Sequence, residues 1–219
     1  MQKIKDEWYK NKTWNGKADS IFEQNFKYTR GDNNKAFYLQ QQGCLLLLNN
    51  QKNIQEVGLA LLSRLIEDFP AEHSSIVLAQ EKMGDYFLHQ KKYGEAAKYF
   101  TIVLDYCAAQ NSSSGTSGLA VLKFAVAIFK TGEIDKMESA YELLQNFSAH
   151  QLKMDDARFY HNETGAHICA ALHKKEEAVK YAAAALKIVT DTPVTLHKKP
   201  GTASPTKQQL HLLQQIWLP

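Results

Sequence analysis

Apolar residues in this chain recur every three or four positions, the spacing that places them on one side of an α-helix. One such segment extends from Val77 to Phe87, and the next contains Ala96 and Phe100. The polar stretch 89–94 between them has the length of a connection that joins two antiparallel helices. The alternating pattern of a β-strand is missing from these segments. The sequence therefore predicts a hairpin of two amphipathic helices here.

The same pair of helical segments recurs along the chain. A spacing of roughly 30 to 45 residues between copies is typical of a stacked repeat architecture. Besides the hairpin described above, the pattern predicts three further copies, at 39–48 with 58–69, 119–129 with 137–147, and 157–172 with 176–189. Pro70 ends the copy at 39–48 with 58–69, since proline cannot continue a helix. We therefore expect an all-α fold, an α-solenoid of antiparallel helix hairpins.

The chain divides into three segments by its sequence pattern. Residues 1–34 contain Trp8 and Trp14 and a helix-like stretch, which we interpret as an N-terminal cap. Residues 35–190 contain the helical repeats. Residues 191–219 begin as a linker that contains Pro, Thr and Lys and continue as an amphipathic helix over 206–217, a C-terminal capping helix or docking segment.

The residues at the expected closest helix contacts resemble those of the tetratricopeptide repeat (TPR) family. The most specific copy has Gly84 and Phe87 in its first helix, with Ala96 and Phe100 in its second. The resemblance covers about residues 35–190 and is looser in the other copies, whose matching small residues are Gly43, Gly58, Ala125 and Gly165. It implies that Gly84 lets two helix backbones approach, and that Phe100 fills the gap before the next hairpin.

The resemblance also implies a concave groove lined by the first helix of each hairpin. Counting from each small residue gives the partner-binding positions Phe37, Gln40, Glu81, Asp85, His89, Leu122, Val126 and Asn162, and also Cys44, Phe129, Phe159 and Ala166. Family members that bind a peptide carboxylate have Lys, Asn and Arg at such positions, whereas this chain has Glu81 and Asp85. We expect a basic or amphipathic helix, or a folded protein surface, as the partner. A plain solvated helix face is the alternative interpretation.

Composition and charge restrict the kinds of partner and the cellular location that we expect for the protein. The chain has 26 Lys and Arg against 23 Asp and Glu, a net charge of +3 spread along its length, so we expect no nucleic acid as partner. Three separated cysteines favour reduced thiols and a cytoplasmic location. Lys3 and Lys5 precede acidic residues and not an apolar stretch, so we expect no export signal. The longest apolar run is far too short to cross a membrane.

Catalytic and metal-binding signatures are not found in the sequence. The common nucleotide-binding and hydrolase motifs are missing, and the Ser-rich stretch 112–118 has the composition of a flexible loop. His161, His167 and His173 follow one another at steps of six, which cannot place three ligands on one helix face. We therefore expect no catalytic residue, cofactor or metal.

Three functions follow from these observations. The leading one is a non-catalytic protein-interaction module that binds a protein or peptide in the groove. The opening segment 6–15 is similar to the start of bacterial repeat proteins of unassigned role, which raises an immunity-type protein that occludes a toxin as a narrower alternative. An enzyme on a helical scaffold is the third, and it would need a pocket of converging titratable groups. A homodimer formed through Trp217 is a further alternative for the partner.

Overall fold

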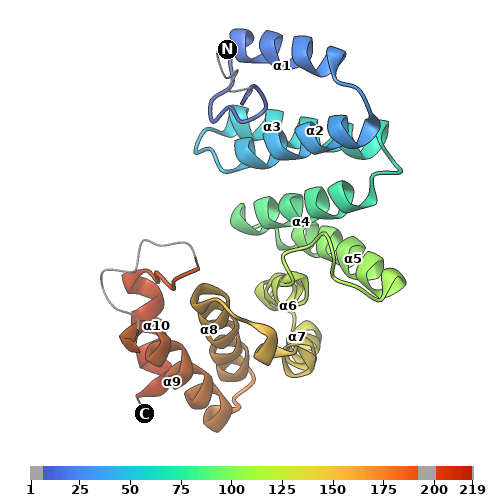
Figure 1. Cartoon of the computed structure of the whole chain (residues 1–219). Helices are drawn as coiled ribbons and strands as arrows, with labels where there is room; N and C mark the ends of the chain where they lie inside the picture. Colours follow the sequence, from blue (N-terminus) through green and yellow to red (C-terminus); the bar gives the residue numbers. More distant parts are fainter. Residues whose placement is uncertain (1–6, 192–200, 219) are drawn as a thin grey trace. The chain divides into compact units, whose positions relative to one another are not determined.

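The structure is a computed structural model that describes residues 7–191 and 201–218, without the side chains of residues 134 and 151. Within these ranges all regular secondary structure is helical and no strand occurs (Figure 1). The all-α prediction is thus confirmed. Residues 192–200 of the expected linker lie outside the described residues. In the part of the chain that is described, we find no helix with the length and apolar character needed to cross a bilayer.

Each predicted helical segment coincides with a helix, but the helices at 32–47 and 52–68 begin seven and six residues before the segments that the apolar pattern predicted. The α-helices are α1 Gly16–Tyr28, α2 Asp32–Leu47, α3 Lys52–Asp68, α4 His73–His89, α5 Tyr93–Gln110, α6 Ala120–Lys130, α7 Ile134–Asn146, α8 Asp155–Ala171, α9 Lys175–Asp191 and α10 Lys207–Trp217, with a short 3-10 helix at Ala149–Gln151. The connection between α4 and α5 is shorter than the predicted stretch 89–94, because α4 ends at His89 and α5 already begins at Tyr93. Lys91 closes this turn with a φ of 58°.

The chain forms two compact units, one of residues 1–120 and one of residues 121–219. This boundary lies inside the range 35–190 that the sequence pattern grouped together. The division into a cap, repeats and a C-terminal segment stays a prediction. The two units are described separately below.

In the first unit, α4 and α5 form a closely packed pair around Gly84. A Cβ atom on Gly84 would lie 2.7 Å from Cε1 of Phe100, closer than real Cβ atoms approach a neighbour. Phe100 and Ala96 are both fully buried. The Phe100 ring therefore lies against the glycine of its own pair, where we had expected it to fill the gap before the next one.

The pair α2–α3 uses two glycines at its closest point. A Cβ on Gly58 would lie 2.9 Å from the carbonyl oxygen of Gly43, and a Cβ on Gly43 would lie 2.6 Å from Cδ2 of Leu62. Such contacts require backbones that approach more closely than any larger side chain allows. α2 also packs against α4, so the first helices of both pairs are neighbours within this unit.

The segment before α2 is attached to the core of the first unit. Trp8 and Trp14 both contact the ring of Phe22 on α1, with centroid distances of 5.2 and 5.5 Å. The buried side chain of Gln42 accepts a hydrogen bond from the backbone N–H of Asn11 at 2.9 Å and donates one to its carbonyl at 2.7 Å. A buried amide that is satisfied in this way fixes the position of the aromatic segment on α2.

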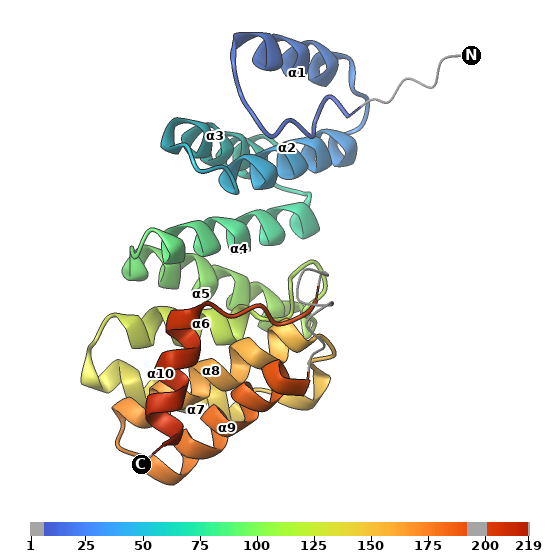
Figure 2. The same cartoon turned by 90° about the vertical axis from the view of Figure 1, so that its left-hand side faces the viewer.

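The second unit contains the pair α8–α9 and the final helix α10. A Cβ on Gly165 would lie 2.7 Å from the ring of Tyr181, the same kind of contact as that of Gly84 with Phe100. α10 packs mainly on α9 and also on α8, and its Leu213 is fully buried. Figure 2 shows α10, in red, lying over the other helices of this unit. A capping box formed by Thr206 and Gln209 begins α10.

Candidate partner-binding surfaces

In the first unit, the neighbouring helices α2 and α4 present a common surface, which we call the α2–α4 face. We use this name for the groove positions that stay at least partly exposed on the two helices, together with Lys82: Phe37 and Cys44 on α2, and Lys82, Asp85 and His89 on α4. Phe37 and Cys44 are seven residues apart and so lie on one side of α2. Cys44 lies near α4: burial raises the pKa of its thiol to about 11, while the charge of Lys82 lowers this pKa and that of Asp85 raises it.

Phe37 is the exposed apolar part of this face. Its side chain stays 42% exposed, although its ring contacts those of Tyr9 at 5.9 Å and Tyr38 at 5.7 Å. Tyr38 in turn contacts Trp8 at 4.7 Å. The aromatic neighbours restrict the rotamers of Phe37, so that binding through this ring would lose little side-chain entropy.

The charged part of the face is provided by α4. Lys82 Nζ and Asp85 Oδ2 form an ion pair at 3.3 Å, and the two side chains are 38% and 22% exposed. His89 is exposed at the end of the helix. Because the lysine offsets the carboxylate, this face is less acidic than the sequence suggested.

Five of the sequence-predicted groove residues are buried. Glu81, Leu122 and Ala166 are fully buried, and Gln40 and Phe159 are each 5% exposed. The structure brings Phe37, Asp85 and His89 to the surface of the first unit, while Val126 and Asn162 are half-buried in the second. Partner binding at the exposed and half-buried positions stays a prediction. Burial removes the other five from the accessible surface: Gln40, Glu81, Leu122, Phe159 and Ala166.

The burial of Glu81 results from the loop that follows α5. Ser117 donates two hydrogen bonds to the Glu81 carboxyl group, one from its backbone N–H to Oε2 at 2.8 Å and one from its hydroxyl to Oε1. In the same loop, Gly115 has a φ of 85° and approaches Val77 on α4. The Ser-rich stretch thus packs against α4. No local pattern in the sequence signals this, because the partners are 36 residues apart.

Val126 lines a pocket in the second unit, which we call the α6–α8–α10 pocket. Its volume is about 240 Å³, and its walls are mainly apolar. The residues that line it are Val126, Phe129 and Lys130 of α6, Tyr160, Glu163, Thr164 and His167 of α8, and Gln208, Gln209 and Leu212 of α10. Val126 and Phe129 were predicted to face a groove, whereas the contribution of α10 could not be foreseen from the repeats.

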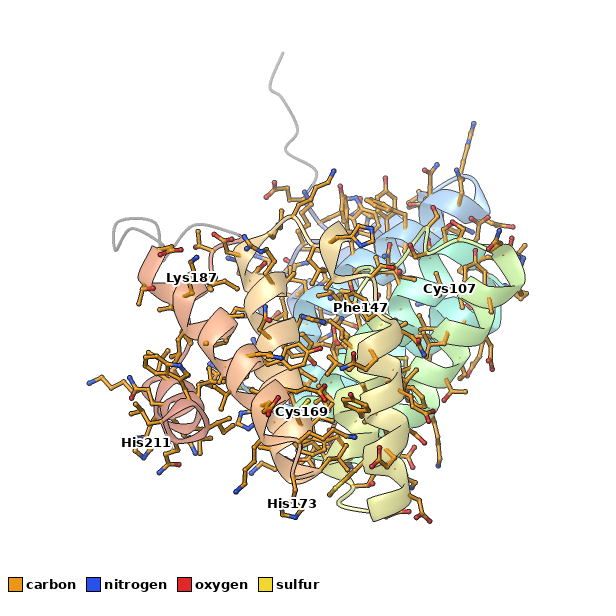
Figure 3. All side chains as sticks on the ribbon, turned by 90° about the horizontal axis from the view of Figure 1, so that it is seen from below. Cys107, Phe147, Cys169, His173, Lys187 and His211 are labelled. Atoms are coloured by element: carbon orange, nitrogen blue, oxygen red, sulfur yellow. The ribbon has the colours of Figure 1, made fainter. Side chains whose placement is uncertain are left out.

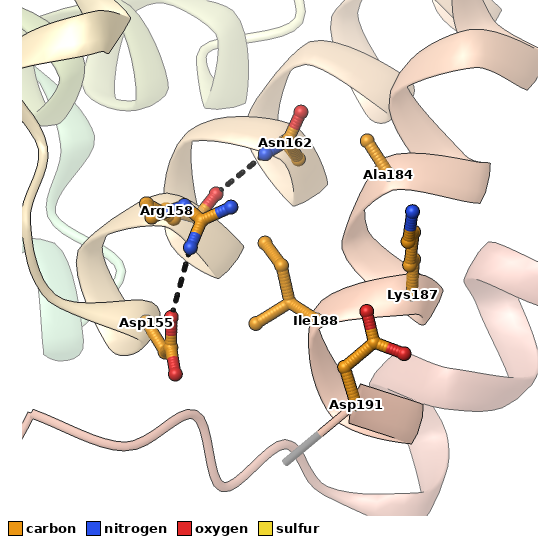
Figure 4. Close-up of a pocket in the computed structure, with 7 residues that line it drawn as sticks. All are labelled: Asp155, Arg158, Asn162, Ala184, Lys187, Ile188 and Asp191. Atoms are coloured by element: carbon orange, nitrogen blue, oxygen red, sulfur yellow. Dashed lines mark hydrogen bonds and ion pairs between the residues drawn. The ribbon is translucent and has the colours of Figure 1, made fainter.

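Asn162 lines a different groove, between α8 and α9 (Figure 4). Its side-chain amide donates to the carbonyl of Arg158 on its own helix at 2.7 Å. Arg158 and Asp155 form an ion pair at 3.1 Å with side chains 51% and 38% exposed. Lys187 and Asp191 add one charge of each sign from α9, so the formal charges of the groove cancel. Exposed and balanced charges of this kind give little affinity for any one ligand.

The three histidines that follow one another at steps of six lie in different environments. His161 is buried between the rings of Phe147 and Tyr181, and burial lowers its pKa. His167 lines the α6–α8–α10 pocket. His173 lies at the edge of the unit, in the turn after α8 (Figure 3). Among the described residues, no group of three His, Cys, Asp or Glu side chains could hold a metal ion.

Comparison with known proteins returned no match to a family, to a curated protein or to a solved structure.

Proposed function

We propose that this chain is a non-catalytic protein-interaction module, built as a TPR-like stack of helix hairpins, and that its partner binds the α2–α4 face. One observation carries the proposal. α2 and α4, the first helices of two successive pairs, pack side by side and leave the ring of Phe37 and the side chain of His89 exposed on them.

The repeat part of the proposal is supported by a recurring glycine contact. Sixteen positions separate Gly84 from Phe100, and the same number separates Gly165 from Tyr181. In the first pair, nineteen positions separate Gly43 from Leu62, so this pair departs from the common spacing. A contact that recurs at one spacing is what an internal repeat produces, since each copy repeats the same helix crossing.

The composition of the face indicates the kind of partner. An exposed aromatic ring is typical of the centre of protein interfaces, where aromatic residues provide much of the binding energy, and mixed charges are typical of the rim. Lys82 and Asp85 at the rim would set the orientation of the partner more than its affinity. We therefore propose a folded protein or an amphipathic helix that places an apolar side chain against Phe37.

Site-specific photo-crosslinking in cells that naturally express the protein tests this. A benzoylphenylalanine replaces Phe37 in one variant and His89 in another, and the crosslinked species are identified by mass spectrometry. Lys98 on α5 and Glu56 on α3 are matched controls, because both are exposed and belong to the second helices of their pairs.

We expect Phe37 and His89 to capture the same protein, and the two control positions to capture none. Capture of one species with equal yield at all four positions, or at the control positions alone, would contradict the α2–α4 face as the binding surface. Capture of a second copy of this chain would instead identify a homodimer.

A further inference from the structure

The α6–α8–α10 pocket combines apolar walls with a small set of polar groups, as ligand sites do. Three of its ten lining residues, Phe129, Tyr160 and His167, carry rings, and Val126 and Leu212 add aliphatic surface. An apolar cavity of about 150 Å³ is known to bind benzene. A volume of about 240 Å³ therefore accommodates a substituted aromatic ring.

The polar groups of the pocket are held in place by α10. The side chain of Gln209 accepts from the backbone N–H of Thr206 at 2.8 Å, which fixes its carbonyl end. Its Nε2 donates to Oε2 of Glu163 at 3.1 Å, which fixes the carboxylate across the pocket. The other carboxylate oxygen, Oε1, accepts no hydrogen bond from the described residues. One acceptor is therefore positioned and available.

The charges of Lys130 and Glu163 indicate which polar substituent of a ligand ring fits this pocket. Lys130 lines the pocket with Glu163. Burial raises the pKa of Glu163, against the lowering effects of its hydrogen bond with Gln209 and of the Lys130 charge, whereas burial and the Lys130 charge both lower the pKa of His167. The cation disfavours a ligand ammonium, and the carboxylate disfavours a ligand carboxylate. A neutral group that both donates and accepts hydrogen bonds matches the pair, and a hydroxyl group is the smallest such group.

We propose that this pocket binds a phenol group, whose ring contacts Val126, Phe129 and Leu212 and whose hydroxyl donates to Oε1 of Glu163 and accepts from Lys130. The site is separate from the α2–α4 face and does not depend on it. The phenol belongs either to a free small molecule or to a tyrosine side chain of a bound peptide, and both sources share this chemistry.

Titration of the full chain with three related probes, followed by NMR, tests the proposal. The probes are p-cresol, 4-methylanisole, which lacks the donor hydrogen, and toluene, which lacks the oxygen. We expect p-cresol to shift the signals of Val126, His167 and Leu212 in a saturable way and to bind at least fivefold more tightly than the other two. Equal affinity for p-cresol and 4-methylanisole, or shifts confined to residues outside the pocket, would overturn the proposal.

Two variants test whether Glu163 is responsible for the tighter binding of p-cresol. Glu163→Gln should reduce the affinity for p-cresol to that for toluene, while Glu142→Gln, at an exposed position on α7, should leave the preference unchanged. An unchanged preference in Glu163→Gln would contradict the assigned donor contact. If Glu163→Gln does not fold, the affinities of the parent chain for p-cresol, 4-methylanisole and toluene still test the proposal. N-acetyl-tyrosinamide separates the sources: binding as tight as that of p-cresol indicates a tyrosine side chain, and weaker binding indicates a free phenol.

Discussion

The carboxyl group of Glu81 accepts both the backbone N–H and the hydroxyl of Ser117, and it is fully buried. This contact fixes the loop after α5 to the middle of α4. Sequence counting placed Glu81 in the groove, where reversal of its charge would be expected to weaken partner binding. Because of the burial, reversal at Glu81 would instead leave a charge without its hydrogen-bond donor and destabilise the first unit.

The first prediction concerns this contact. Ser117→Ala removes one of the two donors to Glu81, and we expect the first unit to lose about 1.5 to 3 kcal/mol, since hydrogen bonds to charged groups contribute about this much. Amide hydrogen exchange in α4 and α5 measures the loss for this unit alone. Ser113→Ala in the same loop, at an exposed position, is the control and should change exchange little. If the amides of α4 and α5 exchanged at the same rate in Ser117→Ala as in Ser113→Ala, the hydrogen bond from the Ser117 hydroxyl would contribute nothing to the stability of the first unit.

A second prediction tests the close approach of α4 and α5. In Gly84→Leu the new side chain must displace Phe100, whose Cε1 lies 2.7 Å from the position of a Cβ on Gly84. We expect a loss of about 2 to 4 kcal/mol in unfolding free energy, because overpacking of a core forces strained rotamers and backbone shifts.

Gly94→Ala in α5 is the matched control for this change. A Cβ on Gly94 meets no atom within 4 Å, so alanine there should be neutral or stabilise by up to about 1 kcal/mol. Urea unfolding of both variants gives the two values. If Gly84→Leu were as stable as the parent, the assigned helix crossing would be wrong.

The third prediction concerns thiol reactivity. Burial raises the pKa of Cys44 and of Cys169 from 9.0 to about 11, and it also raises that of Cys107. Cys169 is fully buried, and Figure 3 marks its position among the helices of the second unit. Since only the thiolate reacts, alkylation of Cys44 and Cys169 at pH 8 should be slower than that of Cys107 by at least tenfold.

The same shifts set a pH dependence of stability. A thiol whose pKa is higher in the folded state favours folding below the unfolded value of 9.0, and this contribution is lost as the pH rises to about 11. Alkylation followed by mass spectrometry from pH 7 to 11 should show Cys44 reacting only at the upper end. Rapid labelling of Cys44 at pH 8 would contradict its burial.

Helix positions could be predicted from the sequence because they depend on local periodicity. The pattern also identified Gly84 as a point of close helix approach, but it placed Phe100 in the gap before the next hairpin, whereas the structure places this ring against Gly84 itself. The site was predictable only in part. Phe37 is exposed, and its role in partner binding stays a prediction. The burial of Glu81 depends on Ser117, which is 36 residues away in a loop without periodicity.

The α6–α8–α10 pocket could not be predicted for a related reason. Glu163 and Gln209 are 46 residues apart, and their contact depends on how α10 packs on α8 and α9. A capping box and an amphipathic pattern predict that α10 forms, but they do not determine the helix on which it packs. The pocket thus depends on contacts between segments far apart in the sequence, which local patterns do not predict.

The central claim is that Phe37 is the centre of a protein-binding surface. Once the crosslinked partner is purified, calorimetry of its binding to the parent, to Phe37→Ala and to the control Lys98→Ala tests this most directly. We expect Phe37→Ala to weaken binding by at least tenfold, because an aromatic ring at the centre of an interface contributes about 2 kcal/mol or more. Lys98→Ala should bind like the parent. Unchanged affinity of a folded Phe37→Ala would contradict the account.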